Sequence, residues 1–240
     1  MRRYIDTLGR PQLWLDDSEI EAEMASALAS ARMRPAPEAP AVDLERFLEV
    51  GLGARVDQHA PLDKDVLGLT TFARGLRPAV QINADLTGAF DAPGAGELER
   101  ARWRSTLAHE GAHVVLHARL FVLDEHQGEL FSEAELGSPV LQRCLKRDVG
   151  FSRSGPDPRE VQANKGMAAL LMPEALFVPL AREAAERLGL RPGDLDPTAS
   201  GSRRLVSGLA QRFEVSRQAI EIRLETFGFL GAEGRSPLGR

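Results

Sequence analysis

Residues 109 to 113 read His-Glu-Gly-Ala-His, and this H-E-x-x-H spacing constrains the fold more than any other feature of the chain. In an α-helix, residues four apart lie on one face, so His109 and His113 can bind a single metal ion. Glu110 projects from the same side and can act as general base toward a water at that ion. The pattern therefore predicts a buried helix with a catalytic zinc site. The alternative is a helix with two structural histidines.

A catalytic zinc ion usually has three protein ligands and one open position, so a third ligand is expected elsewhere in the chain. His117 continues the four-residue step, but it lies about 12 Å along the helix axis from His109, too far to bind the same ion. We therefore expect His117 to contact a ligand or to be structural. Glu160 is the better candidate, and Asn164, four residues later on the same face, is expected to hydrogen-bond a ligand histidine.

The helix that carries Glu160 is predicted to run to Met172. Asp157 is suited to cap its first turn, and Pro158 and Pro173 are typical of a helix start and a helix end. The same residues leave an alternative open, because Asp157 and Glu160 also have the spacing of a capping box.

Two blocks of sequence, residues 106–117 and 160–173, together resemble the ImmA/IrrE family of bacterial zinc metallopeptidases. Residues 79–83 are similar to the strand that precedes the active-site helix in that family. The similarity covers roughly residues 43–230, with most of its specificity in the two blocks. It departs from the family pattern at residues 166–167 (Gly-Met) and in the long, glycine-containing segment between the blocks, which bears on the loops more than on the ligands.

The resemblance implies a function and a set of roles. Zinc would bind His109, His113 and Glu160, and Glu110 would be the catalytic residue. The activity would be that of an endopeptidase that cleaves a helix-turn-helix transcriptional repressor, and so derepresses stress, phage-defence or mobile-element genes.

Composition limits the partners and the compartment. The net charge of −5 gives no general attraction to nucleic acid, which is expected at most as an activator, or to an anionic membrane. The chain lacks a run of about 18 apolar residues and a secretory signal pattern, so a cytoplasmic location is expected. The single cysteine, Cys144, excludes an intramolecular disulfide. Its thiolate could occupy the open zinc position as an inhibitory switch, or it could be a small buried hydrophobic residue.

The predicted fold class is α+β, with a small mixed or antiparallel sheet packed against the helices that carry the zinc site. Strands are expected at residues 54–57, 66–72 and 79–82, and a long helix at 97–120. Shorter helices are expected at 18–33, opened by a capping box at Ser18, and at 44–50, 140–145 and 173–188. The chain is expected to divide into four segments. These are 1–42, with an N-terminal arm (1–16), a helix and a Pro-rich linker; 43–190, the peptidase domain; 191–230, helix-turn-helix-like helices; and 231–240, a disordered tail.

The segment 205–230 has the spacing of a helix-turn-helix, with Ser216 capping the second helix. One interpretation places Arg217 against DNA. The other, which the residues favour, is that these helices only pack on the core, because three arginines are offset by Glu214, Glu221 and Glu225. The alternative function is therefore a DNA-binding or regulatory protein that uses a peptidase-like fold without proteolysis.

Overall fold

The computed structural model describes residues 2–5, 11–73, 75–121, 140–145 and 157–230. In chain order the elements are β1 (Arg2–Ile5), β2 (Pro11–Trp14), α1 (Asp17–Ser30), α2 (Leu44–Arg46), the π-helical turn η1 (Phe47–Gly51), β3 (Arg55–Ala60), β4 (Val66–Phe72), β5 (Ala79–Asn83), α3 (Ala84–Asp91), α4 (Glu97–Phe121), β6 (Val140–Leu145), α6 (Pro158–Leu171), α7 (Glu174–Arg187), α8 (Ser200–Phe213) and α9 (Arg217–Thr226).

The sheet is mixed and small, which confirms the α+β class. Its strand order is β3-β5-β4-β6, with β3 parallel to β5 and the other two pairs antiparallel. A separate antiparallel hairpin, β1–β2, forms in the N-terminal arm.

The helix predicted at 140–145 is wrong, because this segment is strand β6. It pairs with β4 in a register that sets Thr70 opposite Gln142. A six-residue run with several apolar residues has no decisive period, so its state depends on the partner available to its backbone. Here β4 offers a second edge, on the side away from β5, and the backbone groups of β6 are satisfied there.

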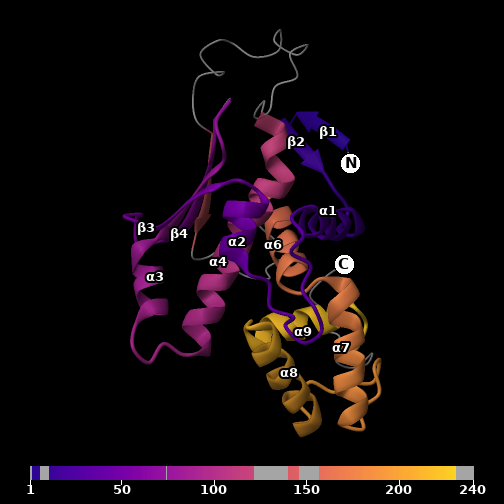
Figure 1. The fold of residues 1–240 in the computed structure, drawn as a ribbon. Helices are drawn as coiled ribbons and strands as arrows, with labels where there is room; N and C mark the ends of the chain where they lie inside the picture. Colours follow the sequence, from indigo (N-terminus) through magenta and orange to yellow (C-terminus); the bar gives the residue numbers. More distant parts are fainter. Residues whose placement is uncertain (1, 6–10, 74, 122–139, 146–156, 231–240) are drawn as a thin grey trace.

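Helix α4 is the centre of the arrangement. It contacts β4 on one side and α6 on the other, and α1 packs against α6. Figure 1 shows α3 and the sheet on one side of α4, with α1 and α6 on the other and α7, α8 and α9 grouped at one end. The α4–α6 crossing is close at Gly166, where an added Cβ would lie 2.7 Å from the Cβ of Ala112. Gly166, which departs from the family pattern, therefore lets the two helices approach.

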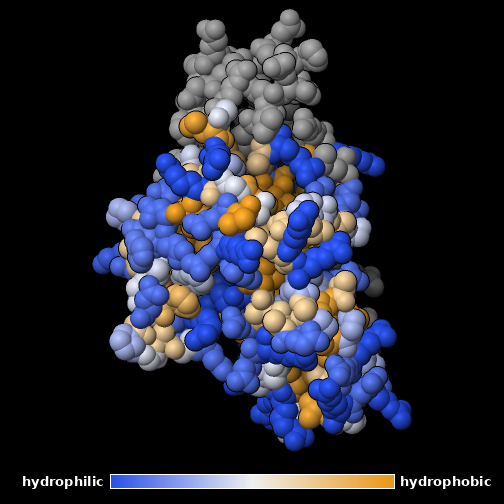
Figure 2. Space-filling view, in the orientation of Figure 1, coloured by the Kyte–Doolittle hydropathy of each residue, from blue (hydrophilic) through white to orange (hydrophobic). Residues whose placement is uncertain are grey.

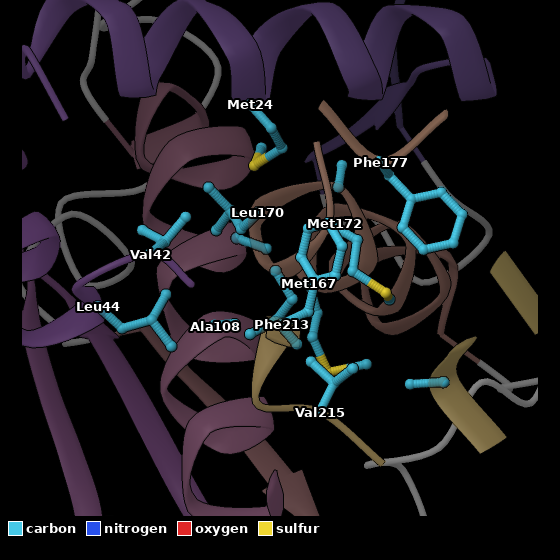
Figure 3. Close-up of a cluster of buried hydrophobic side chains, with 14 of the residues drawn as sticks. Met24, Val42, Leu44, Ala108, Met167, Leu170, Met172, Phe177, Phe213 and Val215 are labelled. Carbon is cyan, nitrogen blue, oxygen red and sulfur yellow. The ribbon is translucent and has the colours of Figure 1, made fainter. Parts of the chain in front are cut away.

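The hydrophobic core is one cluster that draws on most of the chain. It includes Met24 of α1, Ala108 of α4, Leu170 of α6 and Phe213 of α8, and Figure 3 shows these side chains converging. Each fully buried large apolar side chain contributes about 1.5–3 kcal/mol. The N-terminal and C-terminal helices are thus packed on the same core that holds α4 and α6.

Helix α1 begins slightly earlier than its sequence suggested. The capping box is formed by Asp16 and Glu19, where Ser18 and Glu21 were expected. Both pairs have the same spacing. The helix that the earlier pair opens buries Ile20 and Met24 in the core.

The outer surface has no broad apolar face in the view of Figure 2, where hydrophobic residues lie in scattered groups among hydrophilic ones. The large exposed hydrophobic side chains come from separate segments: Trp14, Val50, Leu76 and Leu98. Across the part of the chain that the structure describes, no helix has both the length and the apolar character required to cross a membrane.

Candidate metal centre

Helix α4 brings the two motif histidines together, as the four-residue spacing predicts. His109 and His113 are fully buried, with ring centroids 4.8 Å apart. Their Nε2 atoms face each other at 3.1 Å. The helix thus presents two imidazole nitrogens at one point inside the protein.

Glu160 comes from the first turn of α6 and meets these nitrogens. Its carboxylate oxygens lie 3.1 Å from the Nε2 of His109 and 3.4 Å from the Nε2 of His113. Asp157 caps α6 by accepting from the amide of Arg159, while the Glu160 carboxylate is directed at the two histidines. In the described part of the chain, His109, His113 and Glu160 form a group whose ligand atoms all lie within 4.8 Å of one another.

The electrostatics suit a metal-binding carboxylate between neutral imidazoles. Burial disfavours ionisation of Glu160, but its close contacts with the imidazoles of His109 and His113 outweigh burial and hold the pKa of Glu160 below its ordinary value. Burial also lowers the pKa of His113, although the Glu160 carboxylate opposes this shift. Glu160 therefore stays ionised and His113 stays neutral near neutral pH, which are the protonation states that metal ligands require.

Asn164 lies one turn after Glu160 on α6 and contacts the other nitrogen of His109. The Nδ1 of His109 is 3.1 Å from the Oδ1 of Asn164. A carbonyl oxygen only accepts, so His109 donates from Nδ1 and its Nε2 carries the lone pair. This is the contact expected for Asn164, and it directs the lone pair of His109 at Glu160.

His117 is close to the centre but is not one of the three converging groups. Its Nδ1 lies 2.9 Å from the Nδ1 of His113, and its Nε2 lies 3.2 Å from the Oε1 of Gln162. The ring is fully buried, and burial, with His113 beside it, lowers the pKa of His117 well below its ordinary value. His117 therefore contacts a ligand histidine, as its distance along the helix suggested.

Strand β4 holds the carboxylate of Glu110, a contact that sequence reasoning missed. The hydroxyl of Thr70 donates to Oε2 of Glu110, and both residues are fully buried. A Cβ at Gly68 would lie 2.9 Å from the Cγ and the Cδ of Glu110, so a side chain there would displace the glutamate. Residues 68 and 70 share a face of β4, and a glycine inside a strand often marks a close approach. These two features of β4 were the signal in the sequence that could have predicted the contact.

The donor set fits a tetrahedral zinc site. Bonds of 2.0–2.1 Å in a tetrahedron place neighbouring ligand atoms about 3.3 Å apart. The two Nε2 atoms lie 3.1 Å apart, Oε2 of Glu160 lies 3.1 Å from the Nε2 of His109, and Oε1 of Glu160 lies 3.4 Å from the Nε2 of His113. Two imidazoles and one carboxylate also form a common set for a catalytic zinc ion. The geometry shows a group that could hold a metal ion.

Cys144 belongs to β6, where its backbone pairs opposite Gly68. Its side chain lies outside the described residues. The thiolate switch and the buried-hydrophobe alternative both stay predictions.

The C-terminal helices hold one of their arginines inside the protein and leave another exposed. Ser216 caps α9 as expected, by accepting from the amide of Ala219. Arg223 is buried, donates to Glu21 and to the carbonyl of Met172, and stacks on a phenylalanine ring. The exposed residues of α9 include Arg217, Gln218 and Glu221, a face of mixed charge.

Comparison of the chain with family models, with curated proteins and with solved structures finds no match. The geometry of this centre and the two sequence blocks that carry it are therefore the basis for assigning a function.

Proposed function

We propose that this chain is a zinc-dependent endopeptidase that cleaves a helix-turn-helix transcriptional repressor. The observation that carries the proposal is the convergence of acceptor atoms from His109, His113 and Glu160 inside the protein. Lone pairs and a carboxylate only about 3 Å apart repel one another unless a proton or a metal ion lies between them, and a metal ion can bind all three groups at once. A buried cluster of this kind is stable when it binds a metal ion.

Different residues of the chain would bind the metal ion, transfer protons and position the base. His109, His113 and Glu160 would hold the ion. A bound zinc ion would supply Lewis acidity toward the scissile carbonyl and would lower the pKa of a water molecule. Glu110 is the general base that would accept a proton from water and return it to the leaving amine. Thr70 and Gly68 hold the Glu110 carboxylate in place for both transfers.

The repressor substrate and the regulated genes come from the resemblance of residues 106–117 and 160–173 to the ImmA/IrrE family. A cytoplasmic location agrees with such a substrate. Nucleic acid remains a candidate activator, although the net charge of −5 does not favour it.

The DNA-binding alternative ranks second. It requires cations on the exposed face of α9, but that face carries Glu221 beside Arg217 and Gln218, and Arg223 is buried against Glu21. The alternative also gives no role to Glu110, a fully buried carboxylate that directly follows His109 in α4.

The test compares wild type with Glu110→Gln and with Glu97→Gln. The latter makes the same change at an exposed position on the same helix. We would measure zinc content and cleavage of two probes: a peptide library and a helix-turn-helix repressor encoded beside the gene. We expect all three proteins to bind about one zinc ion, and cleavage to be lost only in Glu110→Gln.

Two results would overturn the proposal. The first is absence of zinc from wild-type protein after metal supplementation. The second is equal cleavage by wild type and Glu110→Gln, which would remove Glu110 from the mechanism. Sequence-specific DNA binding that Arg217→Ala abolishes, without any proteolysis, would support the alternative instead.

A further inference from the structure

We propose that strand β2 of the N-terminal arm is a remote part of the metal centre, because the Leu13 carbonyl sets the tautomer of His113 through Gln162 and His117. The inference depends on one part of the proposed function, that the site binds a metal ion. It does not depend on proteolysis or on the substrate.

The first step is the orientation of the Gln162 amide. The carbonyl of Leu13 can only accept a hydrogen bond, and the Nε2 of Gln162 donates to it. Leu13 is fully buried and Gln162 nearly so. The opposite amide orientation would set two oxygens against each other without a proton between them. The Oε1 of Gln162 must therefore be the atom that faces His117.

The second step determines which nitrogen of His117 carries the proton. The Oε1 of Gln162 also only accepts, and it lies 3.2 Å from the Nε2 of His117, so that nitrogen carries the proton. His117 is fully buried, and its two nitrogens contact Gln162 and His113 rather than an anion, so the geometry favours a neutral ring. Its Nδ1 therefore has the lone pair.

The third step reaches the metal ligand. The Nδ1 of His117 lies 2.9 Å from the Nδ1 of His113, and because the former accepts, the latter must donate. A neutral His113 with a proton on Nδ1 has its lone pair on Nε2. That Nε2 is the atom 3.1 Å from the Nε2 of His109 and 3.4 Å from Glu160. A backbone carbonyl of the arm thus determines which nitrogen of His113 faces the metal position.

Each hydrogen bond in this series has only one possible direction of donation. Reversing it would require the Leu13 carbonyl to donate, which it cannot do. His113 and His117 are both fully buried, so water has little access to replace a lost partner. Since coupling between two sites is reciprocal, metal binding should also favour the docked position of β2.

The first experiment measures the dissociation constant for Zn²⁺ by competition with a chromophoric chelator. Gln162→Met removes both hydrogen bonds at nearly constant length, and His117→Phe removes the next link. Lys165→Met is the control, because Lys165 is a partly exposed residue of α6 that pairs with Asp17 and takes no part in this series of hydrogen bonds.

We expect Gln162→Met and His117→Phe each to raise the Kd for Zn²⁺ roughly 10- to 100-fold, and the control to leave it unchanged. The double variant should bind Zn²⁺ as weakly as His117→Phe alone, because Gln162 acts only through His117. A merely structural role for Gln162 would give additive effects. Thermal unfolding of the metal-free proteins identifies any variant that fails to fold. If His117→Phe fails to fold, the Kd for Zn²⁺ of folded Gln162→Met tests the inference by itself.

The second experiment measures hydrogen exchange of the amides in residues 11–16, with and without Zn²⁺. We expect zinc to increase their protection in wild type and not in folded Gln162→Met. An unchanged Kd in folded Gln162→Met, or additive effects in the double variant, would overturn the inference and leave the proposed function intact. Absence of Zn²⁺ binding in wild type would overturn both.

Discussion

Two helix pairs in this chain have the spacing of functional motifs, and they use their buried polar side chains in opposite ways. In the α4–α6 pair, His109, His113 and Glu160 turn inward and direct acceptor atoms at one point. In the α8–α9 pair, most buried side chains are apolar, and Arg223 is satisfied by Glu21 and a backbone carbonyl. Only the first pair contains a cluster of polar groups that packing alone does not explain.

The difference shows how a buried polar group can indicate function. Burial of polar atoms costs free energy unless they are paired, so a structural polar residue finds a complementary partner, as Arg223 does. Converging lone pairs lack such complementarity unless a proton or a metal ion lies between them. A surface that binds nucleic acid has the opposite requirement, because its cations must stay exposed.

The largest effect is expected from Glu160→Ala in the α4–α6 pair. Loss of one of three ligands should raise the Kd for Zn²⁺ by about 1,000-fold, or about 4 kcal/mol. Chelator competition measures it. Glu174→Ala, an exposed acidic residue in the first turn of α7, is the matched control and should bind zinc normally. Tight zinc binding by Glu160→Ala would show that the third ligand lies elsewhere, with Cys144 next to be tested.

The next effect concerns the α8–α9 pair. Arg223→Met should lower the free energy of unfolding by about 2–3 kcal/mol, because it leaves Glu21 and the Met172 carbonyl without their cation. Arg217→Met, at an exposed position of the same helix, should change it by less than about 0.5 kcal/mol. Urea unfolding measures both. Equal small effects would mean that the buried arginine is not structural.

A smaller effect is expected where the Glu110 carboxylate is displaced while metal binding is unchanged. Thr70→Val keeps the shape but removes the hydroxyl that donates to Glu110, and it should lower kcat about 10-fold with zinc content unchanged. Gly68→Ala should lower kcat as well, because its methyl group would meet the glutamate. Thr70→Ser retains a hydroxyl and should restore most of the activity. If Thr70→Val were fully active, the contact with β4 would have no part in catalysis.

The last effect, measured per pH unit, is the dependence of stability on pH in metal-free protein. Folding lowers the pKa of both His113 and His117 from the ordinary 6.5. Below that pH the unfolded chain binds protons that the folded chain does not, so stability falls as pH falls and levels off above about 6.5. Each histidine contributes a slope of up to about 1.4 kcal/mol per pH unit.

Urea unfolding between about pH 5 and pH 7.5 checks this slope, a window above the range in which Glu160 titrates. His117→Gln should reduce the slope. A slope that His117→Gln leaves unchanged would contradict the assignment to the buried rings.

Sequence periodicity determined the parts of the site that lie within single helices. A four-residue step places His109 and His113 on one face of α4, and Glu160 and Asn164 on one face of α6, whatever surrounds them. The bounds of β4 and the cap of α6 at Asp157 were also predicted correctly, because both depend on neighbouring residues.

Tertiary structure decided the rest, because it depends on pairs of groups far apart in the chain. Strand β6 formed where β4 offered an edge, and Gly68 and Thr70 of β4 met Glu110 some forty residues later. The link from Leu13 through Gln162 to His117 spans most of the chain. Residue type states what each group can donate or accept, but only packing determines which groups come within hydrogen-bond distance.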